Sequence, residues 1–142
     1  MRKKKFLKAC FLLAVMLLLA NFLGCELTVQ VEPEFVGTWE YSTTITIQQK
    51  NTLTFSSTTL NFNFSGLVNG TLNATINSYD ENSNHIEGTV TSATGIFTIG
   101  YSTGSKIYIT YNINGDKLTF QSSNSSYPDP SSLEGQPEYT KK

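Results

Sequence analysis

Cys25 carries the most reactive side chain in this sequence, and its neighbours limit the chemistry open to it. A thiol can bind a metal, attack a substrate, form a disulfide or carry a covalent modification. Only Glu26 stands close to it as a partner for metal binding or catalysis, and the one other cysteine is Cys10. The residues around Cys25 therefore give little support to a metal site or a catalytic nucleophile.

A second group of residues with possible chemistry lies between Asp80 and Glu87. Three of its members alternate in the spacing of a calcium-binding loop: Asp80, Asn82 and Asn84. However, His85 replaces the glycine that such a loop needs, and Thr91 stands where the bidentate acid belongs. His85 and Glu87 would share one strand face, but two ligands alone do not make a zinc site. The segment predicts a plain hairpin loop, with no metal and no cofactor.

Catalysis has few other candidates in this chain. It contains a single histidine, and we find no glycine-rich phosphate loop and no serine in a nucleophile elbow. The neighbouring acids Asp80 and Glu81 could form a catalytic pair only if the fold removed one of them from water. We therefore predict that the protein is not an enzyme.

The segment before Cys25 has the parts of an export signal. A basic cluster, Arg2–Lys5, precedes an apolar run over 9–20, and Gly24 places a small residue just before Cys25. A membrane-spanning helix would need about 20 predominantly apolar residues, and this run is shorter. The pattern predicts export followed by cleavage before Cys25.

The residues Phe22-Leu23-Gly24-Cys25 resemble the lipobox of bacterial lipoproteins, in the relaxed form of spirochaete-type lipoproteins. The resemblance implies that Cys25 carries a diacylglyceryl group and a further acyl chain, such as palmitate, so that the membrane is a partner. It also implies a lipid-anchored place in the cell envelope, and Glu26 favours the outer over the inner membrane. After cleavage no free thiol and no disulfide remain, so packing alone must hold the exported domain together.

This interpretation divides the chain into a signal peptide over 1–24, a lipidated cysteine with a short tether over 25–34, and a β domain over 35–142. Residues 25–142 hold five lysines against all eleven acids, a net charge of −6, and no arginine. Nucleic-acid binding needs a basic face, so this function is excluded. An acidic domain is also repelled by an anionic membrane surface, which suits a body held away from it on a tether.

From Phe35 onward, apolar and small polar residues alternate in short runs without a sustained helical period. The alternation predicts strands that place these residues on shared faces: Trp39, Tyr41, Ile45 and Ile47; Leu53 and Phe55; Leu60, Phe62 and Phe64; Leu72, Ala74 and Ile76; Ile86 and Val90; Phe97 and Ile99; Ile107, Ile109, Tyr111 and Ile113. Asn114-Gly115 predicts a type I′ hairpin turn. Ser122–Pro137 is typical of a long loop, and 138–141 of a closing strand.

About eight short strands at regular spacing predict an all-β fold, an antiparallel up-and-down β-barrel, with a β-sandwich as the alternative. The motif Val36-Gly37-Thr38-Trp39 resembles the opening of lipocalin-like domains, and the segments 113–120 and 139–141 are similar to those of small bacterial lipocalin-like lipoproteins. Lipocalins pack an arginine on the tryptophan, and residues 25–142 have none. The resemblance therefore implies the wider calycin-like group.

Such a barrel implies a cavity for a small apolar ligand. The residues that would line the cavity, or fill it as core, are aromatic: Trp39, Tyr41, Phe55, Phe62, Phe64, Phe97, Tyr111 and Phe120. So many large rings favour a packed interior. Two hypotheses follow. One is a membrane-anchored, non-catalytic lipocalin-like domain that binds a small apolar ligand or a protein partner, and the other is a structural or host-contact surface lipoprotein with a ligand-free barrel.

Overall fold

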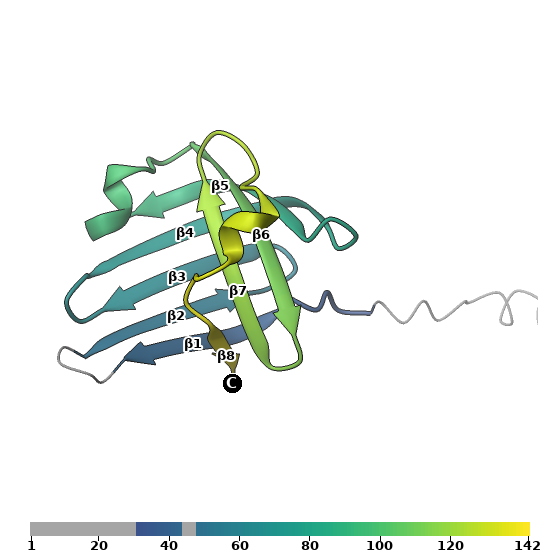
Figure 1. Ribbon diagram of the computed structural model, residues 1–142. Helices are drawn as coiled ribbons and strands as arrows, with labels where there is room; N and C mark the ends of the chain where they lie inside the picture. Colours follow the sequence, from purple (N-terminus) through teal and green to yellow (C-terminus); the bar gives the residue numbers. More distant parts are fainter. Residues whose placement is uncertain (1–30, 44–47) are drawn as a thin grey trace, which may run out of the picture. The chain divides into compact units, whose positions relative to one another are not determined.

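The computed structural model describes residues 31–43 and 48–142. Its compact barrel unit comprises Glu32–Lys142 (Figure 1). Cys25 and the predicted signal peptide lie outside the described residues, as do Ile45 and Ile47. No helix in the described part of the chain combines the length and hydropathy that crossing a membrane requires.

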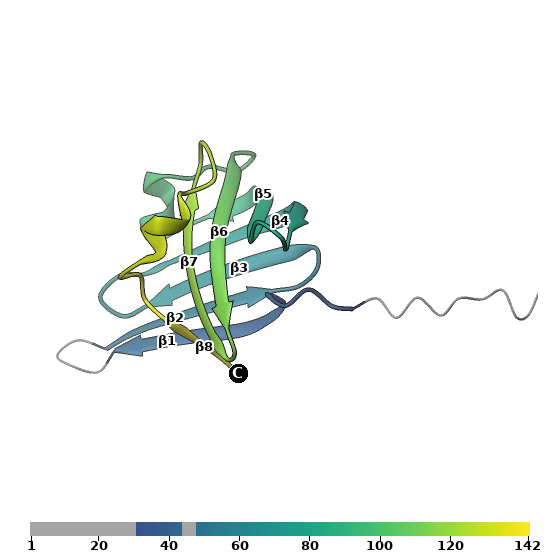
Figure 2. The ribbon, with the colours of Figure 1, turned by 45° about the vertical axis from the view of Figure 1, so that its right-hand side comes forward.

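The unit is a closed antiparallel barrel in which eight strands follow one another in chain order. Their bounds are β1 (Gly37–Thr43), β2 (Gln49–Phe55), β3 (Thr59–Ser65), β4 (Gly70–Asp80), β5 (His85–Ala93), β6 (Lys106–Asn114), β7 (Lys117–Ser123) and β8 (Tyr139–Lys141). β8 pairs with both β7 and β1 and so closes the ring. In Figures 1 and 2, β6 and β7 run steeply across β1–β5. This confirms the predicted up-and-down barrel rather than a sandwich.

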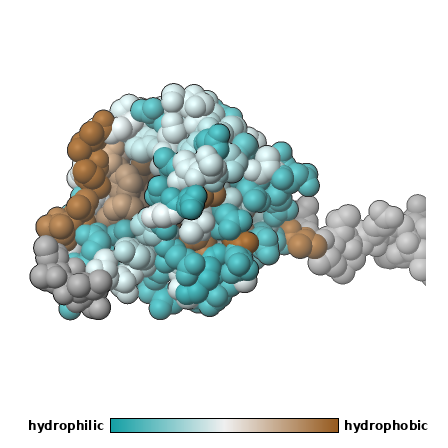
Figure 3. Space-filling view, in the orientation of Figure 1, coloured by the Kyte–Doolittle hydropathy of each residue, from teal (hydrophilic) through white to brown (hydrophobic). Residues whose placement is uncertain are grey.

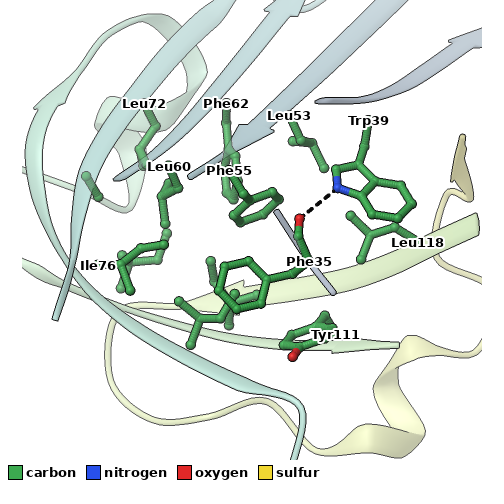
Figure 4. Packing of buried hydrophobic residues seen from close by; sticks show 14 of the residues in the cluster. Phe35, Trp39, Leu53, Phe55, Leu60, Phe62, Leu72, Ile76, Tyr111 and Leu118 are labelled. Atoms are coloured by element: carbon green, nitrogen blue, oxygen red, sulfur yellow. Dashed lines mark hydrogen bonds between the residues drawn. The ribbon is translucent and has the colours of Figure 1, made fainter. Parts of the chain in front are cut away.

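Period-2 alternation builds the core, because every second side chain of a strand points into the barrel. On β2, for example, Leu53 and Phe55 are buried while Thr54 between them is exposed. The interior cluster is apolar and comes from all eight strands and the segment before β1: Phe35, Trp39, Leu53, Phe55, Leu60, Phe62, Leu72, Ala74, Ile76, Ile86, Val90, Ile107, Ile109, Tyr111, Leu118 and Tyr139. Figure 4 shows most of these side chains converging from facing strands.

Three local predictions need correction. Phe97 and Ile99 lie in a short 3₁₀ helix, η1 (Gly95–Ile99), because Gly95 takes a φ of +58° and turns the chain out of β5. The β6–β7 hairpin is present, but Asn114 pairs with Lys117, so Gly115 with a φ of +63° is the first turn residue instead of the second. The predicted loop at 122–137 starts later, since β7 runs to residue 123, and contains a second 3₁₀ helix, η2 (Pro130–Leu133).

The barrel end where β1 begins is filled around Trp39, and we call it the Trp39 end. The Trp39 side chain is fully buried, and its Nε1 donates a hydrogen bond of 2.9 Å to the Phe35 carbonyl oxygen, which Figure 4 shows as a dashed line. The Lys141 Nζ of β8 lies 5.1 Å from the centre of the indole ring. Gly37, at a φ of +139°, leaves room for the Lys141 stem, because a Cβ there would approach Lys141 Cε to 3.0 Å.

Candidate ligand-binding site

A pocket of about 310 Å³ lies at the opposite end of the barrel, which we call the Phe97 end. Antiparallel pairing places the end of β3 and β7 and the start of β2 and β8 there. The residues that line the pocket are mostly aromatic or amide side chains: Asn51, Phe62, Phe64, Phe97, Phe120, Gln121, Ser122, Gln136, Pro137 and Tyr139. The interior therefore has a hollow at the Phe97 end, while Trp39 is fully buried near the other end.

The short closing strand explains why the hollow is at this end. β8 has three residues, and its recorded pairs to β7 stop at Leu118 while those to β1 stop at Glu40. Beyond these pairs, β7 continues to Ser123 and β1 to Thr43. The barrel wall is thus incomplete beside the pocket, and Gln136 and Pro137 of the segment before β8 line the gap.

Four phenylalanines form the apolar wall of the pocket. Phe64 and Phe97 have ring centres 4.9 Å apart, and Phe62 lies 5.1 Å from Phe120, while Tyr139 lies 5.4 Å from Phe120. Phe97 reaches this wall because η1 turns back over the barrel, where the Ile96 amide donates to the Asn69 carbonyl at 3.0 Å. Tilted ring pairs at these distances are attractive beyond their buried area.

A chain of hydrogen bonds crosses the polar side of the pocket. Gln49 Nε2 donates to Asn51 Oδ1 at 2.7 Å, and Asn51 Nδ2 donates to the Tyr139 hydroxyl at 3.3 Å. Burial raises the pKa of Tyr139, and the hydrogen bond from Asn51 partly offsets this effect. Tyr139 therefore stays neutral at physiological pH, and its hydroxyl proton remains free to be donated.

Gln121 Oε1 is a buried acceptor among the pocket-lining residues, and it has no hydrogen-bond partner. Among the described residues it is the one buried side-chain nitrogen or oxygen atom left unsatisfied. A buried polar atom without a partner is rare, because the loss of hydration is not compensated. A residue of the pocket lining therefore carries a buried acceptor without a partner.

The eight predicted lining residues separate into three groups. Phe62, Phe64, Phe97 and Phe120 line the pocket. Trp39, Phe55 and Tyr111 are buried in the core outside its lining, and Tyr41 is half-buried against that core, with its ring 5.6 Å from that of Tyr139.

The polar residues that line the pocket were not predicted from the sequence. Asn51 had a usable signal, because it interrupts the apolar face that Leu53 and Phe55 define on β2. Gln121 gave none, since it falls between Phe120 and Ser122, at a position where alternation predicts a solvent-facing side chain. Gln136 also gave none, because no periodic pattern covers a loop.

The residues from Asp80 to Glu87 form the β4–β5 hairpin and its strand ends, as predicted. The Asp80 carboxylate accepts hydrogen bonds from the Ser83 hydroxyl and the Asn82 amide, and these bonds lower its pKa. The ion pair with Lys106 at 2.7 Å lowers the pKa of Glu87. His85 stacks on Tyr127 at 4.0 Å. Within residues 31–43 and 48–142, no three His, Cys, Asp or Glu side chains are grouped to hold a metal ion.

Architecture and pocket together define the class of protein: an eight-stranded antiparallel barrel with Trp39 buried near one end and an aromatic pocket at the other. Compared with known proteins, the chain matches no family model, no curated sequence and no solved structure.

Proposed function

We propose that the protein is an exported, lipid-anchored binding protein whose pocket at the Phe97 end takes up a small amphipathic molecule. The observation that carries the proposal is the composition of the pocket lining. Four phenylalanine rings line a hollow of about 310 Å³, and the lining also includes Gln121, whose buried Oε1 has no partner. Ligand sites are typically apolar clefts with a few placed polar groups, and this pocket has that character.

The pocket limits the size and the chemistry of its ligand. Its volume lies at the lower end of the range of roughly 300 to 1,000 Å³ that is usual for small-molecule sites. A fused ring system or a short acyl chain is therefore suitable, while a long lipid chain is not. The free acceptor on Gln121 calls for an N–H or O–H donor on the ligand. None of the described residues that line the pocket is a cation, so a neutral molecule is favoured over an anion.

A fluorescent probe can test this assignment. N-phenylnaphthylamine has an aromatic body and a single N–H donor, and its N-methylated analogue keeps the body without the donor. We expect the barrel unit Glu32–Lys142, which holds all eight strands and the complete core, to bind the amine with Kd about tenfold lower than the analogue. Loss of one hydrogen bond of about 1.4 kcal/mol gives this ratio.

The variant Gln121→Leu provides the matched control. It removes the acceptor but keeps the volume of the side chain, so both probes should bind it equally. Its thermal stability should be the same or higher, because the unpaired buried oxygen is gone. If fluorescence titration shows no binding of either probe to the wild-type unit, the pocket does not serve the proposed function. Equal affinities of the wild type for both probes would remove Gln121 from the site.

The anchor is tested separately in bacteria that process lipoproteins. We expect metabolic labelling with palmitate to mark the full chain, and Cys25→Ala to remove the label, because Cys25 is the acceptor in the proposed processing. Cys10→Ala provides the control, since Cys10 lies in the segment that cleavage would remove. Equal labelling of the wild type and Cys25→Ala would exclude the lipid anchor without affecting the pocket assignment.

A further inference from the structure

A second pocket, of about 360 Å³, lies on the outside of the barrel, and we call it the outer pocket. Its floor is the outer face of β6 and β7, where Asn112 and Thr119 stand opposite each other in the strand pairing. These positions alternate with the core residues Tyr111 and Leu118, so their side chains point away from the interior. The helix η2 contributes one wall of the outer pocket, and the β4–β5 turn contributes another.

The loop before β8, which carries η2, is held in place by three contacts. Thr110 lies on the same outer face, yet it is only 1% exposed, because the loop covers it and its hydroxyl donates a hydrogen bond of 2.7 Å to the Pro128 carbonyl oxygen. The Tyr127 ring stacks on His85 with ring centres 4.0 Å apart. The Asp129 carboxylate caps η2 by accepting a backbone hydrogen bond of 2.8 Å. The walls of the outer pocket are therefore fixed by contacts within the protein.

The polar side chains of the outer pocket fall into a bonded and a free group. The hydroxyls of Ser83 and Thr110 already donate hydrogen bonds to other protein groups. Within the described residues, no hydrogen bond involves the side chains of Asn84, Asn112 or Thr119. An amide offers two donors and an acceptor, and a hydroxyl both donates and accepts. The outer pocket therefore presents unused donors and acceptors next to one another.

The rest of the lining limits the charge of a ligand. Among the described residues that line the outer pocket, Glu134 is the only charged one, so an anion would meet repulsion and no compensating cation. Pro130 and Leu133 of η2 add a small apolar surface. Figure 3 shows mainly hydrophilic residues on the face where β6, β7 and η2 lie. The lining thus suits a neutral molecule that carries several hydroxyl groups and a small apolar face.

We propose that the outer pocket binds a carbohydrate. A sugar ring lies with its C–H face against Pro130 and Leu133, and its hydroxyl groups bond to Asn84, Asn112 and Thr119. Sugar hydroxyls both donate and accept, so they can use both functions of the amide side chains. No residue lines both pockets, so this site goes beyond the proposed function and adds a second class of ligand.

Nuclear magnetic resonance titration of the isotope-labelled barrel unit Glu32–Lys142 tests this assignment. The probes are maltose, cellobiose, lactose and N,N′-diacetylchitobiose, each added up to about 20 mM. We expect at least one of them to bind with a Kd of about 1 mM or lower and to shift the side-chain amide signals of Asn84 and Asn112. The side-chain amide signals of Asn51 and Gln136, which line the pocket at the Phe97 end, should not move.

A matched pair of double variants provides the control. Asn112→Leu with Thr119→Val removes the hydrogen-bonding groups and keeps the size of the side chains, so it should bind that sugar about tenfold more weakly. Thr52→Val with Asn63→Leu makes the same changes at a cross-strand pair of β2 and β3 and should bind the sugar like the wild type. In both pairs the asparagine is exposed and the threonine half-buried, so the melting temperatures should change little and alike.

Three outcomes would overturn the proposal. In the first, none of the four disaccharides shifts the Asn84 and Asn112 signals, and in the second, the two double variants bind the sugar equally. In the third, diaminobutane binds more tightly than every sugar and loses its binding in Glu134→Gln, which would make the outer pocket a cation site. N-phenylnaphthylamine should bind with the same Kd when the sugar is present, because the two pockets share no residue. Failure of either assignment therefore leaves the other intact.

Discussion

The two ends of this barrel are built from the same alternating strands and differ in what fills them. At the Trp39 end, a buried indole is held by a hydrogen bond from its Nε1 to Phe35 and lies beneath the Lys141 ammonium. At the Phe97 end, the rings stand around a hollow, and the acceptor of Gln121 has no partner. At the Trp39 end the indole N–H has its hydrogen-bond partner within the protein. At the Phe97 end the Gln121 oxygen has none, so a partner for it would have to come from a ligand.

The difference originates in the three residues of β8. Their pairs with Trp39 and Glu40 of β1 and with Lys117 and Leu118 of β7 complete the wall at one end only. A closed ladder has no free edge, whereas an incomplete one must be covered by loops. The segment 124–138 performs this covering, and its residues contribute amide and proline side chains to the pocket. A short closing strand thus converts one end of a packed barrel into a site.

The largest expected effect compares one ring from each end. Trp39→Ala should lower the free energy of unfolding by about 3 to 5 kcal/mol, because it leaves a cavity in a packed core. Phe97→Ala should lower it by less than about 2 kcal/mol, because that ring already borders a hollow. N-phenylnaphthylamine binding should follow the opposite order, unchanged in folded Trp39→Ala and weakened in Phe97→Ala. Urea unfolding followed by circular dichroism measures the stabilities.

If Trp39→Ala and Phe97→Ala lowered the free energy of unfolding by similar amounts, the Trp39 end would not be the structural end and the Phe97 end would not be the functional one. Trp39→Phe serves as a milder second variant if Trp39→Ala does not fold. It keeps an aromatic ring in the core but removes the hydrogen bond to the Phe35 carbonyl. Its stability should therefore lie between those of the wild type and Trp39→Ala.

The sequence was sufficient for the barrel and insufficient for the pocket, for a physical reason. Alternation along a strand depends on local pairing, so the faces around Leu53, Phe62 and Ile109 could be predicted from residue spacing alone. The pocket depends on where β8 ends and on how the loop before it crosses the gap. Both features depend on tertiary structure, which leaves no periodic pattern in the sequence. Gln121 illustrates the limit, because its position on β7 predicts exposure while its side-chain oxygen is buried.

The same limit applies to the Trp39 end, where the sequence placed the tryptophan but not its cation. Because residues 25–142 contain no arginine, the indole had no predicted cationic neighbour. Lys141 takes that place because β8 pairs with β1 so that Trp39 and Lys141 are opposite each other. The lysine stem then crosses Gly37, where a larger residue would meet its Cε. Register, rather than residue type, decides which cation reaches the ring.

The smallest expected effect tests this contact. Lys141→Met keeps an apolar stem over the indole and removes the charge, so the free energy of unfolding should fall by about 0.5 to 1 kcal/mol, the usual range for an exposed cation–π pair. Trp39 is the only tryptophan, so its fluorescence can follow urea unfolding directly. Lys142→Met is the control, because it removes a neighbouring charge that pairs with Glu40 at 3.2 Å and not with the ring. A smaller loss in Lys142→Met than in Lys141→Met, with a shift of Trp39 emission in Lys141→Met alone, would assign the stabilisation to the contact with the indole. Equal losses would show that net charge, and not the position above Trp39, is what the lysines contribute at this end.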